Sequence, residues 1–150
     1  MATCGFVGRI RPAPGTWGTL WGIPLGLLLI RFGPLGYMVA TGVLIMVAII
    51  AAQLHEAVHA GDVDKNGAPR DVHDSQEVVI DEVVGYLVAF TWLPMNWTSV
   101  VTAFVLFRAL DIVKPFPISW LDRKVKGGLG TVVDDLAAGL VANIILQAVL

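Results

Sequence analysis

Apolar residues are concentrated in five segments of this chain, and shorter polar stretches separate them. A helix needs about 20 apolar residues to cross the roughly 30 Å hydrocarbon layer of a bilayer. Residues 34–54 and 131–150 reach that length, whereas residues 78–93 and 97–113 are shorter or charged near one end. Residues 17–30 form the weakest segment, and Pro24 predicts a broken or re-entrant helix there. The pattern predicts an all-α polytopic membrane bundle of four to five hydrophobic helices.

Composition agrees with a bilayer as the solvent. The chain is 56% hydrophobic and 15% charged, against roughly 45–50% and 25% in soluble domains. A length of 150 residues predicts one domain, residues 1–150. The net charge of −2 indicates no nucleic-acid partner, and a single cysteine excludes an internal disulfide. The expected partner is the lipid bilayer, and the composition leaves the oligomeric state open.

The basic residues predict an orientation. Three polar stretches, residues 1–16, 55–77 and 114–130, alternate with two short connections at residues 31–33 and 94–96. Successive connections lie on opposite sides of a membrane, so every Lys and Arg except Arg31 falls on one side, together with every Asp and Glu. The positive-inside rule makes that side cytoplasmic. Residues 1–16 lack the continuous apolar core of a signal peptide, so we expect insertion to depend on the internal segments.

Small residues predict where the helices approach one another. Gly18, Gly22 and Gly26 recur every four residues in the first segment, which indicates a close packing face. In the third segment Gly85 lies four residues after Asp81, and in the fifth Gly139 lies four residues after Asp135. We therefore expect the third and fifth segments to pack through these small faces.

Four carboxylates lie near one end of these two segments, where burying a charge is expensive. They are Asp81, Glu82, Asp134 and Asp135. Close packing would bring the two acidic pairs together, and clustered carboxylates suit Mg²⁺, which prefers oxygen ligands. The structural alternative is that acids early in a helix complement its dipole, which is worth about 0.3–1 kcal/mol each. Paired acids on two helices favour the metal site.

Several cations on the same predicted side are candidate phosphate ligands. Arg108, Asp111 and Lys114 are spaced by threes and share an arc of helix surface. An internal ion pair is one interpretation, and a phosphate site made of the Arg fork and the Lys charge is the other. Lys126 adds a further cation beside Gly127 and the glycines that follow it.

Three other sequence patterns allow more than one structural or functional interpretation. In residues 114–130, Trp120 and its apolar neighbours interleave with charged residues, which is typical of a short helix in the headgroup layer and equally of an ordinary connector. His55, Glu56 and His59 match the H-E-x-x-H zinc-hydrolase pattern, which would need a third ligand such as His73. Residues 62–67 resemble the start of a calcium loop but lack its final glutamate, so we interpret them as a solvated turn.

Five motifs together resemble the phosphatidylglycerophosphatase A family. They are PGTWGT at residues 14–19, IDEVVG at 80–85, FRALDIVKPFP at 107–117, WLDR at 120–123 and GGLGTVVDD at 127–135. The resemblance extends from Pro14 to Gly139, and its specificity comes from the order and spacing of the motifs. Thr19 stands where serine is expected in this family.

The resemblance implies a Mg²⁺-dependent enzyme of the bacterial inner membrane. Such an enzyme removes the terminal phosphate of phosphatidylglycerophosphate, an anionic phospholipid, at the cytoplasmic face. The expected metal ligands are Asp81, Glu82, Asp134 and Asp135, and these are also expected to be catalytic, together with Asp111. The expected substrate ligands are Thr16, Arg108, Lys114 and Lys126. The alternatives are a zinc intramembrane protease and a non-enzymatic ion carrier or scaffold.

Overall fold

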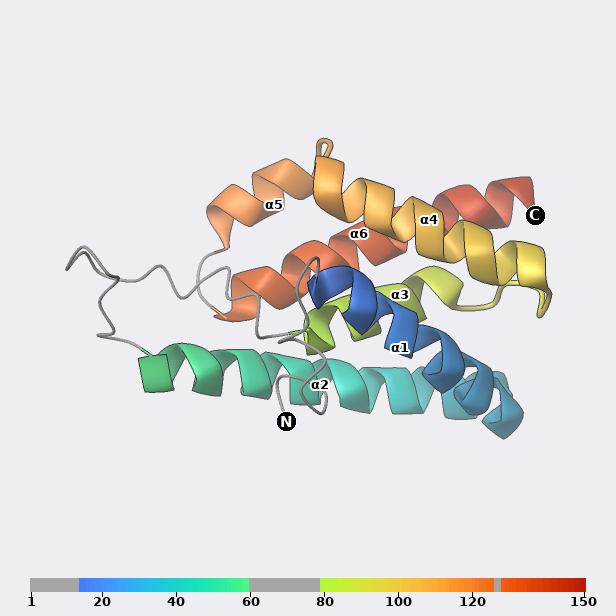
Figure 1. Ribbon diagram of the computed structural model, residues 1–150, viewed down its shortest axis with the longest axis horizontal. Coiled ribbons are helices and arrows are strands. Elements are labelled where there is room, and N and C mark those ends of the chain that lie inside the picture. Colours follow the sequence, from blue (N-terminus) through green and yellow to red (C-terminus); the bar gives the residue numbers. More distant parts are fainter. Residues whose placement is uncertain (1–13, 60–78, 126–127) are drawn as a thin grey trace.

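The computed structural model describes residues 14–59, 79–125 and 128–150, and every regular element within them is helical (Figure 1). The elements are α1 (Pro14–Leu29), the 3₁₀ turn η2 (Ile30–Phe32), α2 (Gly33–His59), α3 (Ile80–Phe90), α4 (Trp97–Val113), α5 (Ile118–Lys124) and α6 (Gly128–Val149). The all-α prediction is confirmed for the described residues.

Two helical stretches are long and apolar enough to cross a membrane, Thr16–Val58 and Leu129–Val149. The first turns back at η2, so that α1 and α2 form a hairpin (Figure 1). Large apolar side chains on the outer face of α2 are exposed, among them Leu35, Met46 and Ile50. A continuous apolar surface of this kind is typical of contact with lipid or another protein.

The third predicted segment is shorter as a helix than its apolar run suggested. α3 has 11 residues, about 16 Å at 1.5 Å per residue, and is too short to cross a bilayer alone. It ends at Phe90, shortly before Trp92, whose φ of 59° is outside the helical region. The Asn143 amide, from α6, donates hydrogen bonds to the carbonyl oxygens of Ala89 at 3.0 Å and Thr91 at 2.7 Å. These bonds satisfy acceptors that a longer helix would satisfy internally.

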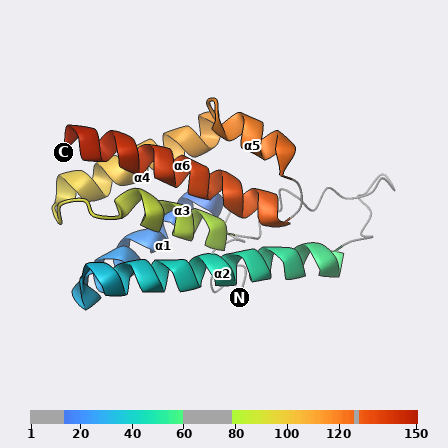
Figure 2. The same cartoon turned by 180° about the vertical axis from the view of Figure 1, so that it is seen from behind.

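α3 is nevertheless the centre of the bundle, packed against α1, α2, α4 and α6 (Figures 1 and 2). The predicted glycine face of α1 makes this possible. A Cβ on Gly18 would lie 2.8 Å from the Cβ of Val79, and one on Gly22 would lie 2.8 Å from Cδ1 of Tyr86. The close contact predicted from the glycine repeat is confirmed.

The expected break at Pro24 is not observed, because α1 continues through it as one helix. A proline inside a helix removes one backbone hydrogen bond and favours a kink. The contacts of Gly22 and Gly26 with α3, on either side of Pro24, hold both halves of α1 against the same partner. Tertiary packing therefore outweighs the local preference for a break.

α3 and α6 meet through the small residues predicted for them. A Cβ on Gly85 would lie 2.8 Å from the backbone oxygen of Asp135, and one on Gly139 would overlap the backbone oxygen of Gly85. The two backbones are thus in direct contact, which places the side chains that precede each glycine by one turn close together.

Helix ends differ from the predicted segments in two further places. α2 continues to His59, so the HEAVH motif is helical and does not open the expected polar loop. α6 begins at Gly128, before the predicted residue 131. The short helix expected around Trp120 is present as α5. Hydropathy did not locate these helix boundaries, because it reports the preference of each residue for lipid or water and not the conformation of the backbone.

The connections divide between the two ends of the bundle as the charge pattern predicted. The α1–α2 turn, the α3–α4 connection and Leu150 share one end, and α5 lies at the other (Figure 1). Arg31 belongs to the first end, and Lys114, Arg123 and Lys124 belong to the second. The polar stretches before residue 14 and between residues 60 and 78 lie outside the described residues.

Candidate active site

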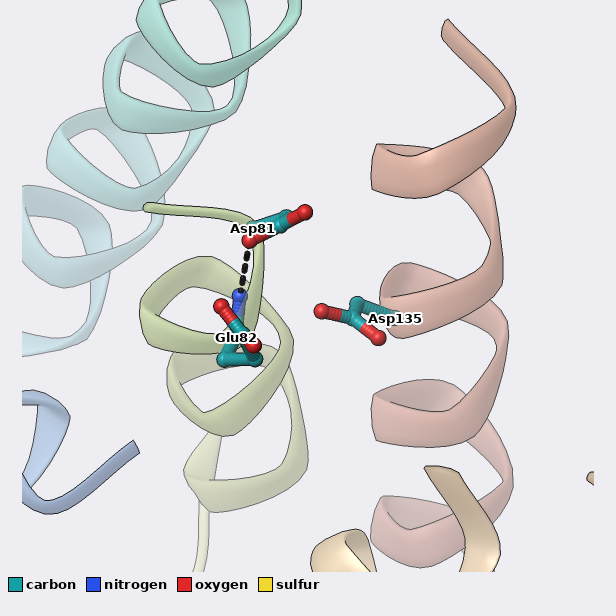
Figure 3. Close-up of side chains that lie close together, drawn as sticks. All are labelled: Asp81, Glu82 and Asp135. Carbon is teal, nitrogen blue, oxygen red and sulfur yellow. Dashed lines mark hydrogen bonds between the residues drawn. The ribbon is translucent and has the colours of Figure 1, made fainter. Parts of the chain in front are cut away.

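Three carboxylates from two helices face one another near the beginning of α3 (Figure 3). α3 begins on the side of the bundle where α5 lies (Figure 1). Asp81 and Glu82 lie in the first turn of α3, and Asp135 faces them from α6. One carboxylate oxygen of each lies within 4.8 Å of the others. Asp81 is 2% exposed and Asp135 6% exposed. We call Asp81, Glu82 and Asp135 the carboxylate triad.

The N-terminal end of α3 stabilises part of the negative charge of the carboxylate triad. The Asp81 carboxylate accepts a hydrogen bond from the Glu82 backbone N–H at 3.0 Å, and the positive end of the helix dipole favours acids in the first turn. These groups do not satisfy the whole triad. Oε2 of Glu82 is buried and accepts no hydrogen bond from the described residues, and a buried unsatisfied carboxylate oxygen is unfavourable.

The donor set of the triad fits a hard divalent cation. Unit charges 4 Å apart repel by about 4 kcal/mol at an effective dielectric constant of about 20, so three clustered carboxylates need a positive partner. An all-carboxylate set with an unsatisfied oxygen matches the ligand preference of Mg²⁺. Among the described residues, the triad is therefore the group that could hold a divalent cation.

An ion pair on α4 borders the triad. Arg108 donates from Nη1 to Oδ2 of Asp111, three residues on. Asp111 lies within electrostatic range of Asp81 and Asp135, and Arg108 within range of Glu82. Nε of Arg108 is buried and donates to no described acceptor. The guanidinium therefore has an N–H donor near the carboxylates that makes no hydrogen bond to the described residues.

Asp134 is not part of the triad, so the described geometry brings together three of the four carboxylates expected as metal ligands. Its Oδ2 accepts a hydrogen bond from Nζ of Lys114 at 2.9 Å. Successive residues of a helix point about 100° apart. Because Asp135 faces α3, its neighbour Asp134 is directed toward the end of α4, where Lys114 lies. The acidic pair of α6 therefore contacts two different helices.

Lys114 reaches Asp134 from an unusual backbone position. It is the C-cap of α4 in the left-handed region, with φ 43° and ψ 58°, and its N–H donates to Leu110 at 2.8 Å. Glycine is the usual residue there, since a side chain costs about 1–2 kcal/mol in this conformation. The ion pair with Asp134 offsets part of that cost and turns the chain toward α5.

The remaining predicted ligands are less directly placed. Thr16 is half-buried in the first turn of α1. A Cβ on Gly18, two residues later, would lie 3.6 Å from Oε2 of Glu82, so the start of α1 forms a wall beside the triad. Sequence reasoning assigned Gly18 to packing alone, although its place within PGTWGT was a signal of this second role. Lys126 lies outside the described residues.

The zinc alternative gains no support from the fold. His55 and Glu56 lie near the C-terminal end of α2, and the expected third ligand, His73, lies outside the described residues. Among the residues that the structure describes, the carboxylate triad is the group that brings three potential metal ligands together.

Comparison with known proteins gives the family of the chain. A family model described as phosphatidylglycerophosphatase A matches residues 1–150. A phosphatidylglycerophosphatase A of Haemophilus influenzae is 35% identical over 144 residues, 95% of this chain and 82% of that protein. One of Escherichia coli (strain K12) is 37% identical over 144 residues, 95% of this chain and 77% of that protein. No solved structure matches the chain. The extent of these matches shows that the chain belongs to the phosphatidylglycerophosphatase A family.

Proposed function

We propose that this chain hydrolyses the terminal phosphate monoester of phosphatidylglycerophosphate, giving phosphatidylglycerol and phosphate in phospholipid synthesis. The observation that carries the proposal is the carboxylate triad beside Arg108 and Lys114, at one end of an apolar bundle. A phosphatase for a lipid headgroup needs this combination of metal ligands, cations and membrane contact. The names of both relatives support the same substrate.

In this proposal Asp81, Glu82 and Asp135 hold Mg²⁺. Phosphate monoesters are among the slowest compounds to hydrolyse in water, with catalysed rates up to ~10²¹-fold higher. Bound Mg²⁺ supplies Lewis-acid stabilisation of the charge on the phosphate oxygens. The carboxylates would hold it beside the start of α1, where a Cβ on Gly18 would lie 3.6 Å from Oε2 of Glu82.

The protein's own cations bind and orient the phosphate. Arg108 has an unused Nε donor, and its planar fork suits phosphate oxygens. Asp111 orients Arg108 through their ion pair. Asp134 positions Lys114, whose partly exposed side chain adds a second positive charge. Thr16, in the first turn of α1, is a further candidate phosphate contact. Lys126 lies outside the described residues and stays a candidate from the sequence alone.

We also propose that the chain crosses the bacterial inner membrane several times with this end in the cytoplasm. Arg31 is at the opposite end, whereas the other described Lys and Arg residues lie in α4, α5 or their connections. The bias of basic residues toward one side is what sets orientation in such proteins. The headgroup of a cytoplasmic-leaflet lipid then lies at the level of the triad.

Phosphate release tests the function. Purified full-length protein in a non-ionic detergent should release phosphate from phosphatidylglycerophosphate with Mg²⁺, stop when a chelator is added, and resume when Mg²⁺ is restored in excess. Arg31→Gln, at the far end of the bundle, is the control that should release phosphate like the parent. Folded protein that releases no phosphate with any divalent cation would contradict the proposal.

A further inference from the structure

A second lipid-facing feature lies outside the carboxylate triad, at the corner formed by α5. Phe116 is 81% exposed and Trp120 is 49% exposed, and Arg123 and Lys124 are exposed beside them. We call these four residues the α5 corner. The catalytic groups do not include any of them, so their chemistry needs a separate explanation.

The orientation of the corner is set by packing on its inner side. Ile118 is fully buried in the main hydrophobic core, and α5 packs along α6. Because one face of this short helix is anchored, Trp120 and the basic residues of its last turn are held outward. The exposed apolar rings are therefore a fixed property of the fold.

Within the corner, aromatic and basic groups are combined. Nζ of Lys124 lies 4.3 Å from the ring centroid of Trp120, a cation–π contact that keeps the ammonium beside the ring. Trp at the boundary of the hydrocarbon layer, with Lys and Arg reaching into the headgroups, is the usual arrangement at a membrane interface.

The position of the corner matches that interface. α5 follows the end of α4 and packs on α6, on the side of the bundle where α3 and α6, the helices that carry the triad, begin (Figure 1). Ile112 and Val113, at the end of α4, are 70% and 73% exposed and extend the apolar surface toward the membrane-facing helices. A bilayer around α2 and α6 places its headgroups at this level.

We propose that the α5 corner binds the headgroups of anionic phospholipids at the membrane surface, at a place separate from the reacting phosphate. Charge complementarity selects this occupant, because Arg123 and Lys124 offer positive charge where Phe116 and Trp120 meet the bilayer. The acids of the triad would repel anionic lipid, and the corner provides local attraction to the same class of lipid that the enzyme must admit.

Thermal unfolding with defined lipids tests the proposal without any need for turnover. Full-length protein in non-ionic detergent is titrated with phosphatidylserine, which has no phosphate monoester, or with zwitterionic phosphatidylcholine. Phosphatidylserine should raise the Tm of the parent more than phosphatidylcholine does, and added salt should reduce the difference. The half-saturating phosphatidylserine concentration should rise about fivefold in Arg123→Gln and in Lys124→Gln, the effect of ~1 kcal/mol per basic residue at an anionic surface.

Two matched variants separate local binding from net charge. Arg31→Gln removes one exposed cation at the opposite end, and Arg123→Lys keeps the charge of the corner; both should bind phosphatidylserine like the parent. The proposal is overturned if the parent does not prefer phosphatidylserine, or if Arg31→Gln weakens binding as much as the corner variants do. Because the lipid-induced change in Tm does not depend on turnover, a protein without phosphatase activity would still give a clear result.

Discussion

Asp134 and Asp135 show how adjacent residues of one helix acquire different tasks. Asp135 is directed at Asp81 and Glu82, whereas Asp134 accepts a hydrogen bond from Lys114. Both are carboxylates and both are buried. The difference lies in the charge of the neighbours, negative for Asp135 and positive for Asp134, so removing each charge should have opposite effects on stability.

Asp135→Asn should abolish phosphate release and raise the Tm measured without Mg²⁺, because it removes repulsion within the triad. It should also abolish the stabilisation by Mg²⁺, which for the parent is ~2.7 kcal/mol at a hundred times the Kd. Asp134→Asn is the matched control. It should keep the Mg²⁺ response and lose about 1 kcal/mol of stability with its ion pair to Lys114.

Melting curves with and without Mg²⁺, recorded beside turnover, check both variants. An active Asp135→Asn enzyme with the parent's Mg²⁺ response would remove Asp135 from the proposed ligand set. Loss of the Mg²⁺ response in Asp134→Asn, with its fold intact, would return Asp134 to that set and favour the four-carboxylate site expected from the sequence.

At the scale of elements, the contact between α3 and α6 determines whether the triad forms. Gly85 and Gly139 bring the two backbones together, and each lies one turn after a carboxylate of the triad. Any side chain at Gly139 must push the helices apart, since its Cβ would overlap a backbone oxygen that has no freedom to rotate away.

Gly139→Ala should therefore lower the free energy of unfolding by about 1–3 kcal/mol, the usual range for overpacking, and weaken the Mg²⁺ response. Gly42→Ala is the control, because nothing lies within 4 Å of a Cβ on Gly42 in α2. It should be neutral or stabilising by up to about 1 kcal/mol, the difference in helix propensity between glycine and alanine. Chemical unfolding in detergent measures the free energy of unfolding of both variants. Equal free energies would contradict the close contact between α3 and α6.

At the scale of the whole molecule, the two ends of the bundle carry different chemistry. The α5 end holds the triad and most described cations, and the opposite end holds Arg31 and the exposed aromatic residues Trp92 and Trp97. Aromatic residues alone suit either membrane interface, whereas the basic residues distinguish the cytoplasmic one.

Cysteine labelling should show this asymmetry. In a Cys4→Ala background, Lys124→Cys should react with a membrane-impermeant thiol reagent only when the cytoplasmic face is open, and Leu150→Cys should react from the other side. Labelling of both positions from one side would contradict the orientation and with it the cytoplasmic site. Retained phosphatase activity in each variant confirms that the labelled protein is folded.

The sequence by itself determined the helical class, the glycine faces, the division of charge between the two ends and the family. These follow from local periodicity and from the order of motifs, which need no knowledge of distant contacts. It also indicated Asp81, Glu82 and Asp135 as neighbours, because Gly85 and Gly139 follow them at helical spacing.

Only the tertiary structure decided the length of α3, the continuity of α1 through Pro24 and the separation of Asp134 from Asp135. Each depends on a partner far away in sequence. Asn143 donates a hydrogen bond to the carbonyl oxygen of Thr91 just after α3, and the surface of α3 contacts α1 on both sides of Pro24. Lys114 donates a hydrogen bond to Asp134, which is not part of the triad. Hydropathy reports the preference of a residue for lipid or water. The direction of a side chain around a helix, and what it meets there, depends on the neighbouring helices.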